Sequence, residues 1–158
     1  MKAVVMKKVG LTGVMDFVDC QEPVVMPGHA VVEVAAAGVN FMDIGVRLGM
    51  AWTEMANPKI LGVEGAGRVL SVGDGVDGFA VGDRVAWVYA PGSYAERHSI
   101  LADSLVRIPD AVDDRTAASV MMQGLTASHF ATDFYPLQLW DIALVHAAAG
   151  GLGLLLTQ

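Results

Sequence analysis

The sequence predicts a mixed α/β chain in which a β-rich, barrel-like unit precedes the first strand, glycine turn and helix of a second unit. Up to about residue 107, short Val- and Ala-rich runs alternate with Gly, Pro, Asn and Asp, roughly every ten residues, which is typical of short strands joined by turns. Near the other end, the glycine-rich segment 147–153 lies between two apolar runs. These two patterns separate the β-rich part from the second unit.

Composition narrows the class of protein. Of the 158 residues, 54% are hydrophobic and 17% are charged, which favours a folded globular chain over a disordered one. Seventeen acidic and ten basic residues give a net charge of −7 without any Lys/Arg run, so we expect neither a nucleic-acid nor a membrane partner. The start lacks the apolar core of a signal peptide, which favours a cytoplasmic protein. Cys20, the single cysteine, excludes an internal disulfide.

In the β-rich part, Val- and Ala-rich runs bounded by turn residues predict five strands. They are 2–6, 30–37, 65–72, 84–88 and a late one around 93–100. Asp-Gly pairs suit the positive φ angles of a tight turn in the segment 72–78.

Helices are predicted by apolar spacing and by capping residues. Residues 40–49 carry apolar side chains at helical spacing after a possible cap at Asn40 or Asp43. A second helix is expected over 116–122, with Asp113 or Asp114 as its cap. Gly124 predicts a break before a third helix over 126–134.

The second unit is predicted from a strand, turn and helix. Residues 142–146 form an apolar run rich in strand formers, and a helix is expected over 154–156. With Ala148 in the first glycine position, Gly150 and Gly153 complete the G-x-G-x-x-G spacing of a dinucleotide-binding turn. A glycine turn in this position also occurs for purely structural reasons. Because the helix stops about one turn after it starts, we expect the natural polypeptide to continue.

Six segments in order resemble the quinone oxidoreductase family, also known from zeta-crystallin, of the medium-chain dehydrogenase/reductase superfamily. They are GVNFMD (38–43), LGVEGAGRVLSVGDGV (61–76), VGDRVA (81–86), GSYAE (92–96), QGLTA (123–127) and VHAAAGGLG (145–153). The resemblance implies a GroES-like catalytic domain over 1–122 and the start of a truncated Rossmann nucleotide-binding domain over 123–158.

The same resemblance predicts an enzyme without metal. Zinc-dependent relatives place a cysteine and a histidine where this chain has Asn40 and Val63, and neither of these residues is a normal zinc ligand. The four-cysteine loop of those relatives is also absent. By resemblance, the full-length protein is expected to be a homodimeric oxidoreductase that uses NADPH to reduce quinones or conjugated enones.

Site residues follow from the matched motifs. Asn40 and Asp43 are the expected catalytic residues, and Asn40 is also expected to contact the cofactor. The family often has an aromatic residue in the segment that is Met50-Ala51-Trp52 here, so Trp52 is expected to take its place and stack on a flat acceptor. The remaining expected NADPH contacts are Thr126, Ala149, Gly150, Gly151 and Leu152.

Two other functions fit the same motifs. One is an enoyl-thioester or vinyl-ketone reductase of the same superfamily, and the other is a catalytically silent, crystallin-like NADPH-binding protein. Gln123 replaces a lysine that the family often has before GLT, which leaves the choice of acceptor open. The 158-residue chain by itself is expected to bind NADPH poorly and to be inactive, because most of a nucleotide-binding sheet lies outside it.

Overall fold

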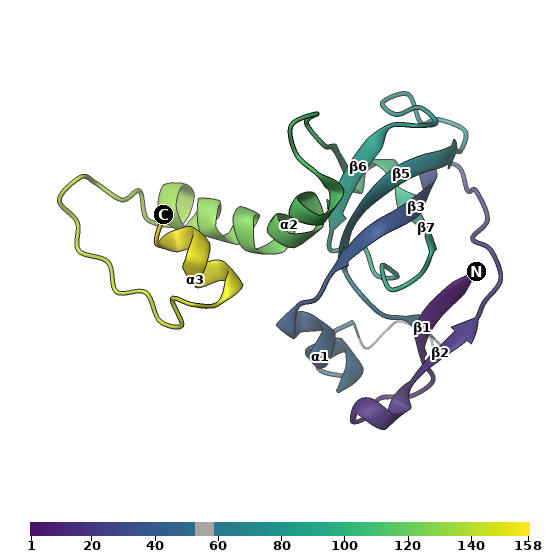
Figure 1. The fold of residues 1–158 in the computed structure, drawn as a ribbon, viewed down its shortest axis with the longest axis horizontal. Coiled ribbons are helices and arrows are strands. Elements are labelled where there is room, and N and C mark those ends of the chain that lie inside the picture. Colours follow the sequence, from purple (N-terminus) through teal and green to yellow (C-terminus); the bar gives the residue numbers. More distant parts are fainter. Residues whose placement is uncertain (53–58) are drawn as a thin grey trace. The chain divides into compact units, whose positions relative to one another are not determined.

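A computed structural model describes residues 1–52 and 59–158, which form two compact units, Met1–Ser119 and Val120–Gln158 (Figure 1). The first unit contains all the strands found in the described part of the chain, and the second is helical. The predicted mixed α/β class, with a β-rich first part, is confirmed. The assignment of the second unit to the start of a Rossmann domain stays a prediction.

Two antiparallel sheets build the first unit. The smaller has the order β2-β1-β4, formed by β2 (Met15–Asp19), β1 (Lys2–Met6) and β4 (Lys59–Ile60). The larger has the order β7-β3-β5-β6-β8, formed by β7 (Arg97–Leu101), β3 (His29–Gly38), β5 (Glu64–Val72), β6 (Arg84–Val88) and β8 (Leu105–Arg107). Two short 3-10 helices, η1 (Thr12–Val14) and η2 (Ala102–Ser104), connect strands.

Alternating strand positions form the main core. Buried side chains from the five strands of the larger sheet pack together: Ala30, Val32, Val69, Val85, Trp87, Ile100 and Leu105. Successive residues of a strand point to opposite faces of a sheet. The small Val and Ala side chains and the large Trp87 indole therefore pack together on one face. Trp87 satisfies its indole N–H by donating to Ser93 Oγ at 2.8 Å.

Four predicted strands are confirmed with small changes at their ends, and the fifth is shorter than expected. It begins at Arg97 because the backbone N–H groups of Gly92 and Ser93 donate to the Gly62 carbonyl, so these residues form a loop instead of a ladder. Strands β2, β4 and β8 were not expected. Each has only two to five residues and lies at an edge of its sheet, so its sequence is too short to show a clear strand pattern.

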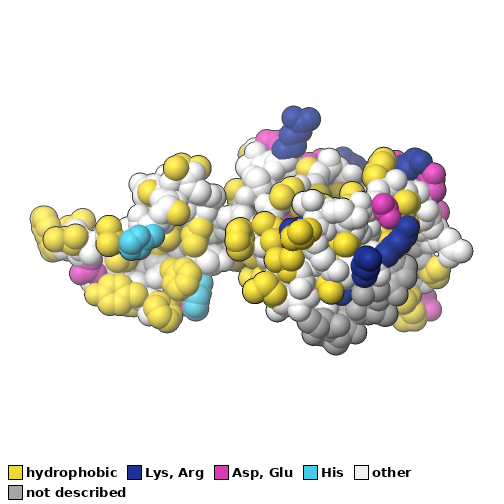
Figure 2. Space-filling model, turned by 90° about the horizontal axis from the view of Figure 1, so that it is seen from below, with side chains coloured by type: hydrophobic (Ala, Val, Ile, Leu, Met, Phe, Trp, Pro, Cys, Tyr) yellow, Lys and Arg dark blue, Asp and Glu magenta, His cyan; other side chains and the backbone are white. Residues whose placement is uncertain are grey.

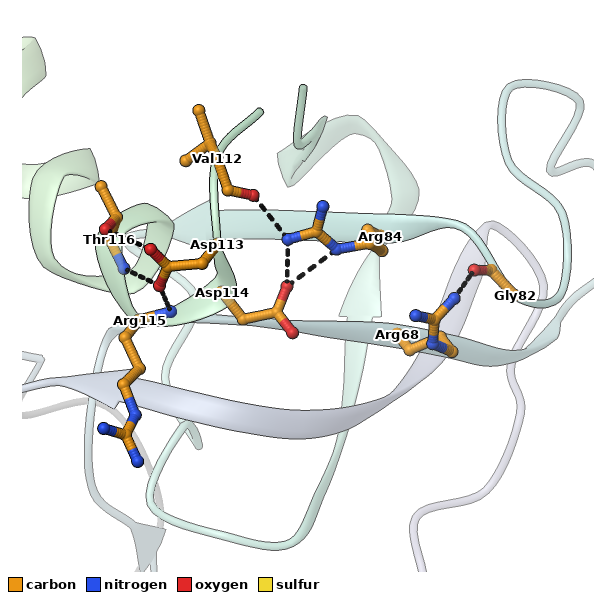
Figure 3. Close-up of polar contacts among 8 residues, drawn as sticks. All are labelled: Arg68, Gly82, Arg84, Val112, Asp113, Asp114, Arg115 and Thr116. Atoms are coloured by element: carbon orange, nitrogen blue, oxygen red, sulfur yellow. Dashed lines mark hydrogen bonds and ion pairs between the residues drawn. The ribbon is translucent and has the colours of Figure 1, made fainter. Parts of the chain in front are cut away.

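Helix α1 (Phe41–Arg47) confirms the first predicted helix, with Asn40 at its N-cap. The predicted second helix is longer than expected: α2 runs from Asp114 to Ser128. Asp113 is its cap, since Oδ1 accepts from the N–H groups of Arg115 (2.9 Å) and Thr116 (3.0 Å), as Figure 3 shows.

An arginine ties the start of α2 to strand β6. Arg84 donates through Nε (3.0 Å) and Nη2 (2.7 Å) to Asp114 Oδ1, and Nη2 also donates to the Val112 carbonyl at 2.6 Å (Figure 3). On the neighbouring strand, Arg68 donates to the Gly82 carbonyl at 2.6 Å in the same view. The VGDRVA segment therefore anchors the helix as well as forming a turn.

The predicted break at Gly124 is wrong. The helix continues through it, because a mid-helix glycine lowers stability by only about 1 kcal/mol relative to alanine and does not by itself end a helix. A π-helical segment, η3 (His129–Phe134), follows α2.

The predicted strand over 142–146 is also wrong. These residues form no ladder, and Ile142 is 100% and Leu144 84% exposed. A strand needs a neighbour to satisfy its backbone, and the second unit offers none among its described residues. Figure 2 shows hydrophobic side chains at the surface of this unit.

The expected helix after the glycine turn is present as α3 (Gly151–Leu156). No helix in the described part of the chain has the length and apolarity needed to cross a membrane.

Candidate active site

The candidate site begins where β3 ends and α1 starts. Gly38 closes the strand, and a Cβ at this position would collide with the Glu64 carboxylate and lie 2.6 Å from the Ala118 carbonyl oxygen. Only glycine therefore lets the chain pass this close to Glu64. Two residues later Asn40 caps α1, where the Asp43 Oδ2 atom accepts its backbone N–H at 2.8 Å.

Asn40 and Glu64 form a buried amide–carboxylate pair. Asn40 Nδ2 donates to Glu64 Oε2 at 2.7 Å, although the two residues are 24 positions apart. Glu64 is the first residue of β5 and only 1% exposed, and Asn40 is 6% exposed. A hydrogen bond to an ionised group with so little water around it fixes the orientation of the amide.

Tyr94 holds the other carboxylate of the site. Its hydroxyl donates to Asp43 Oδ2 at 2.7 Å across 51 positions of sequence. Burial, and then the hydrogen bond to Asp43, raise the pKa of Tyr94 above its ordinary value, so the phenol stays protonated and remains a donor.

Glycine at position 62 makes room for this tyrosine. Gly62 has φ +85° and lies against the Tyr94 ring, so that a Cβ there would overlap the ring. The site thus depends on a glycine that belongs to none of the strands or helices.

A cavity of about 430 Å³ adjoins these side chains. Its wall is mostly apolar, and the described residues that form it all belong to the first unit: Thr12, Met15, Val39, Asn40, Phe41, Asp43, Ile44, Arg47, Leu61 and Tyr94. The predicted catalytic residues, Asn40 and Asp43, therefore share one cavity. Asp43 is 8% exposed, and its Oδ1 atom has no hydrogen-bonding partner among the described residues.

Trp52 lies next to this region but does not line the cavity. It is partly buried and packs, as Tyr94 does, against a buried cluster of Met6, Val46 and Leu61. Its backbone has φ +48°, and its carbonyl accepts from Lys59 Nζ at 3.2 Å. Residues 53–58, which follow it, lie outside the described part of the chain. A stacking role for Trp52 stays a prediction.

The predicted cofactor residues other than Asn40 lie in the second unit. Thr126 Oγ1 donates to the Met122 carbonyl of its own helix at 2.7 Å. The chain turns at Ala147, with φ +51°, and the Gly150 N–H closes the turn by donating to the Ala147 carbonyl at 2.8 Å. A Cβ on Gly153 would approach Ala148 Cα to 2.6 Å, so this glycine allows the helix to pack on the turn.

Helix α3 begins directly after this turn. Its first internal hydrogen bond runs from the Leu154 N–H to the Gly150 carbonyl at 2.8 Å, so the N–H groups of residues 151–153 precede the hydrogen-bonded part of the helix.

Three polar residues of the first-unit site were not assigned catalytic or binding roles from the sequence. Glu64 and Tyr94 lie in matched motifs, yet their contacts to Asn40 and Asp43 join distant segments. Arg47 could have been found from the sequence, because it lies seven residues after Asn40 and therefore shares a helix face with Asn40 and Asp43. Among residues 1–52 and 59–158, no group of three or more His, Cys, Asp or Glu side chains could hold a metal ion.

Comparison with known proteins identifies the family. Residues 26–110 match the alcohol dehydrogenase GroES-like domain. A quinone oxidoreductase of Pseudomonas aeruginosa is 40% identical over 92% of this chain and 45% of its own length. The polyketide synthase GfsB of Streptomyces halstedii is 43% identical over 83% of this chain, but that match covers 2% of the synthase.

Solved structures agree with this family. The Escherichia coli quinone oxidoreductase, crystallised in complex with NADPH, is 32% identical with a TM-score of 0.94, over 99% of this chain and 48% of that one. The chain spans about half the length of the quinone oxidoreductases that it matches. It therefore belongs to the quinone oxidoreductase family of medium-chain dehydrogenases/reductases, of which it is the N-terminal, GroES-like portion.

Proposed function

We propose that the full-length protein is a zinc-free, NADPH-dependent reductase of quinones or other conjugated carbonyl compounds. The observation that carries the proposal is the buried pair of Asn40 Nδ2 and Glu64 Oε2, 2.7 Å apart beside an apolar cavity. A neutral amide in this position binds the oxygen of an organic acceptor by hydrogen bonding, whereas it is a poor ligand for zinc.

The residue next to Glu64 supports a reaction without metal. Val63, which stands where zinc-dependent relatives have a histidine, is 1% exposed and offers only an apolar side chain. Without a Lewis acid to polarise an isolated ketone, the favoured acceptors are those that delocalise the incoming electrons over a conjugated system. Quinones and enones are such acceptors.

The glycine turn fits the predicted cofactor. Gly153 packs against the turn, and the N–H groups of residues 151–153 precede the hydrogen-bonded part of α3, which is the arrangement that receives a pyrophosphate in dinucleotide-binding turns. Ala149, Gly150, Gly151, Leu152 and Thr126 are proposed to hold NADPH, which supplies a hydride when it is bound. The E. coli relative, whose structure was solved with NADPH, supports this choice.

The residues of the first unit would position and stabilise the acceptor. Asn40 would donate an amide N–H to the acceptor oxygen, on which negative charge develops during the reduction. Tyr94 and Asp43 fix the start of α1, and hence the position of Asn40. The apolar side chains around the cavity lower the local polarity once an acceptor is bound, which strengthens the hydrogen bond to that oxygen. A proton from water completes the reduction.

NADPH oxidation by full-length protein, followed at saturating cofactor with 1,4-benzoquinone and with an enone, tests this proposal. We expect Asn40→Ala to lower kcat/KM by about 100-fold or more, the effect of removing one donor to a developing oxyanion. Gln21→Ala is the matched control, because Gln21 is an exposed amide away from the cavity, and it should leave the rate unchanged. Equal rates for Asn40→Ala and the parent protein would contradict the role of Asn40.

A second candidate is an enoyl-thioester reductase, which the similarity to a polyketide synthase supports. The same assay with an enoyl thioester separates the two functions by their kcat/KM values. Binding of NADPH without turnover of any of these acceptors would instead favour a catalytically silent, crystallin-like protein.

A further inference from the structure

The cavity beside Asn40 contains a positive charge that the proposed reaction does not use. Arg47 lines the cavity and is half-buried, and its Nη1 atom makes no hydrogen bond with any residue that the structure describes. Its Nη1 atom is buried. Buried polar atoms are normally hydrogen-bonded, so a buried guanidinium nitrogen without an acceptor beside a cavity points to an oxygen ligand in that cavity.

A helix-end role does not account for this arrangement. Arg47 is the last residue of α1, where a positive charge interacts favourably with the helix dipole. That interaction acts through space and is equally available to an exposed side chain. It does not require the guanidinium to line an apolar cavity, and it leaves the buried Nη1 without an acceptor.

The charges along α1 make the two ends of the cavity electrostatically different. Asn40, Asp43 and Arg47 share one helix face, and Arg47 lies one turn beyond Asp43, about 6 Å along the axis. Asp43 and Glu64 both flank Asn40, so an anion near the amide is repelled. An acceptor with an anionic end is therefore oriented with its neutral carbonyl at Asn40 and its anion at Arg47.

We propose that the cavity binds conjugated acceptors that carry a carboxylate, with Arg47 as the residue that binds this group. The proposal rests on the proposed function and narrows its substrate class from neutral quinones and enones to oxo-alkenoic acids and similar anions. The planar guanidinium matches the two oxygens of a carboxylate, and the apolar wall formed by residues such as Met15, Ile44 and Leu61 packs against the carbon chain.

Binding can be measured on the 158-residue chain, because the described residues of the cavity wall all belong to its first unit. The probes are 4-oxopentanoate and its methyl ester, which are saturated, so they do not alkylate Cys20, and which differ only in charge. NMR titration should show the acid binding at least about tenfold more tightly than the ester to the parent chain. Equal affinities, or no binding of either probe, would overturn the proposal.

Three variants locate the effect. Arg47→Gln should abolish the preference for the acid, and Arg47→Lys, which keeps the charge, should retain part of it. Arg115→Gln is the matched control, since it removes the same charge from an exposed arginine outside the cavity, and it should keep the full preference. A preference that survives Arg47→Gln refutes the assignment. If Arg47→Gln does not fold, the affinities of the parent and of Arg47→Lys for the acid and the ester still test the proposal.

Turnover separates this proposal from the function on which it rests. On full-length protein with NADPH, 4-oxopent-2-enoate should have a higher kcat/KM than its methyl ester, and Arg47→Gln should remove that difference. If no conjugated acceptor is turned over but the Arg47-dependent binding persists, the proposed reductase function fails while the carboxylate site stands. If the methyl ester and neutral quinones both have a higher kcat/KM than the acid, the carboxylate site fails and the reductase function stands.

Discussion

His98 makes the stability of the first unit depend on pH. The imidazole, on β7, lies edge-on to Trp87 with ring centroids 6.0 Å apart, and its Nε2 atom is buried without a partner among the described residues. Burial lowers the pKa of His98 from 6.5 to about 4, and a hydrogen bond to the Ala90 backbone only partly opposes this. The folded chain therefore keeps His98 neutral at pH values where the unfolded chain protonates it.

The sign and size of the effect follow from proton binding. Well above pH 6.5 both states are neutral at His98, and its titration contributes nothing to the free energy of unfolding. As the pH falls below 6.5 the unfolded chain binds a proton that the folded chain does not, so stability decreases by up to about 1.4 kcal/mol per pH unit. The decrease ends near pH 4, where the folded chain also takes up the proton, after a total loss of about 3 kcal/mol.

Urea unfolding of the chain at several pH values between 7.5 and 4 measures this loss. His98→Gln should remove most of the decrease in that range, whatever its own stability at pH 7.5. His146→Gln, which changes an exposed histidine, should retain it. An NMR titration of the His98 ring provides a direct check. A midpoint near 6.5, or the same pH dependence in His98→Gln as in the parent, would refute the reasoning.

Three further substitutions test individual contacts of the first unit. Tyr94→Phe removes the donor to Asp43 Oδ2 and should lower the free energy of unfolding by about 1 to 3 kcal/mol, measured by urea denaturation; an unchanged midpoint would contradict the bond at 2.7 Å. Asp113→Ala removes the cap of α2 and should cost about 0.5 to 2 kcal/mol, whereas Asp113→Asn should recover most of it; equal losses in both variants would argue against capping. Gly62→Ala combines φ +85° with overlap on the Tyr94 ring, so it should lower the unfolding midpoint more than Gly75→Ala, which has φ +79° but open space around it. Similar midpoints for the two glycine variants would show that the ring is not what excludes a side chain.

The parts of the fold that depend on neighbouring residues were predictable from the sequence. Asn40 as the cap of α1 follows from the residues directly after it, and Asp113 as the cap of α2 was one of two expected positions. The long strands of the larger sheet carry enough Val and Ala to be recognised without their partners.

The parts of the site and fold that depend on distant residues could not be predicted from the sequence. Glu64 meets Asn40 across 24 positions and Tyr94 meets Asp43 across 51, and nothing in either local sequence records the contact. The run 142–146 shows the opposite failure, since its residues favour a strand but the described chain provides no strand beside it. Propensity gives the conformation that a segment accepts, whereas pairing decides whether it adopts it.

Gly62 and Tyr94 have a consequence for how related sequences diverge. Because the tyrosine ring occupies the space that a side chain at position 62 would need, the two positions are not free to vary separately. We expect relatives that keep an aromatic residue at position 94 to keep glycine at position 62, and relatives with a larger residue at position 62 to have lost the ring. In such relatives Asp43 would need a different donor. A substitution at the loop glycine Gly62 would therefore alter the start of α1 through its effects on Tyr94 and Asp43.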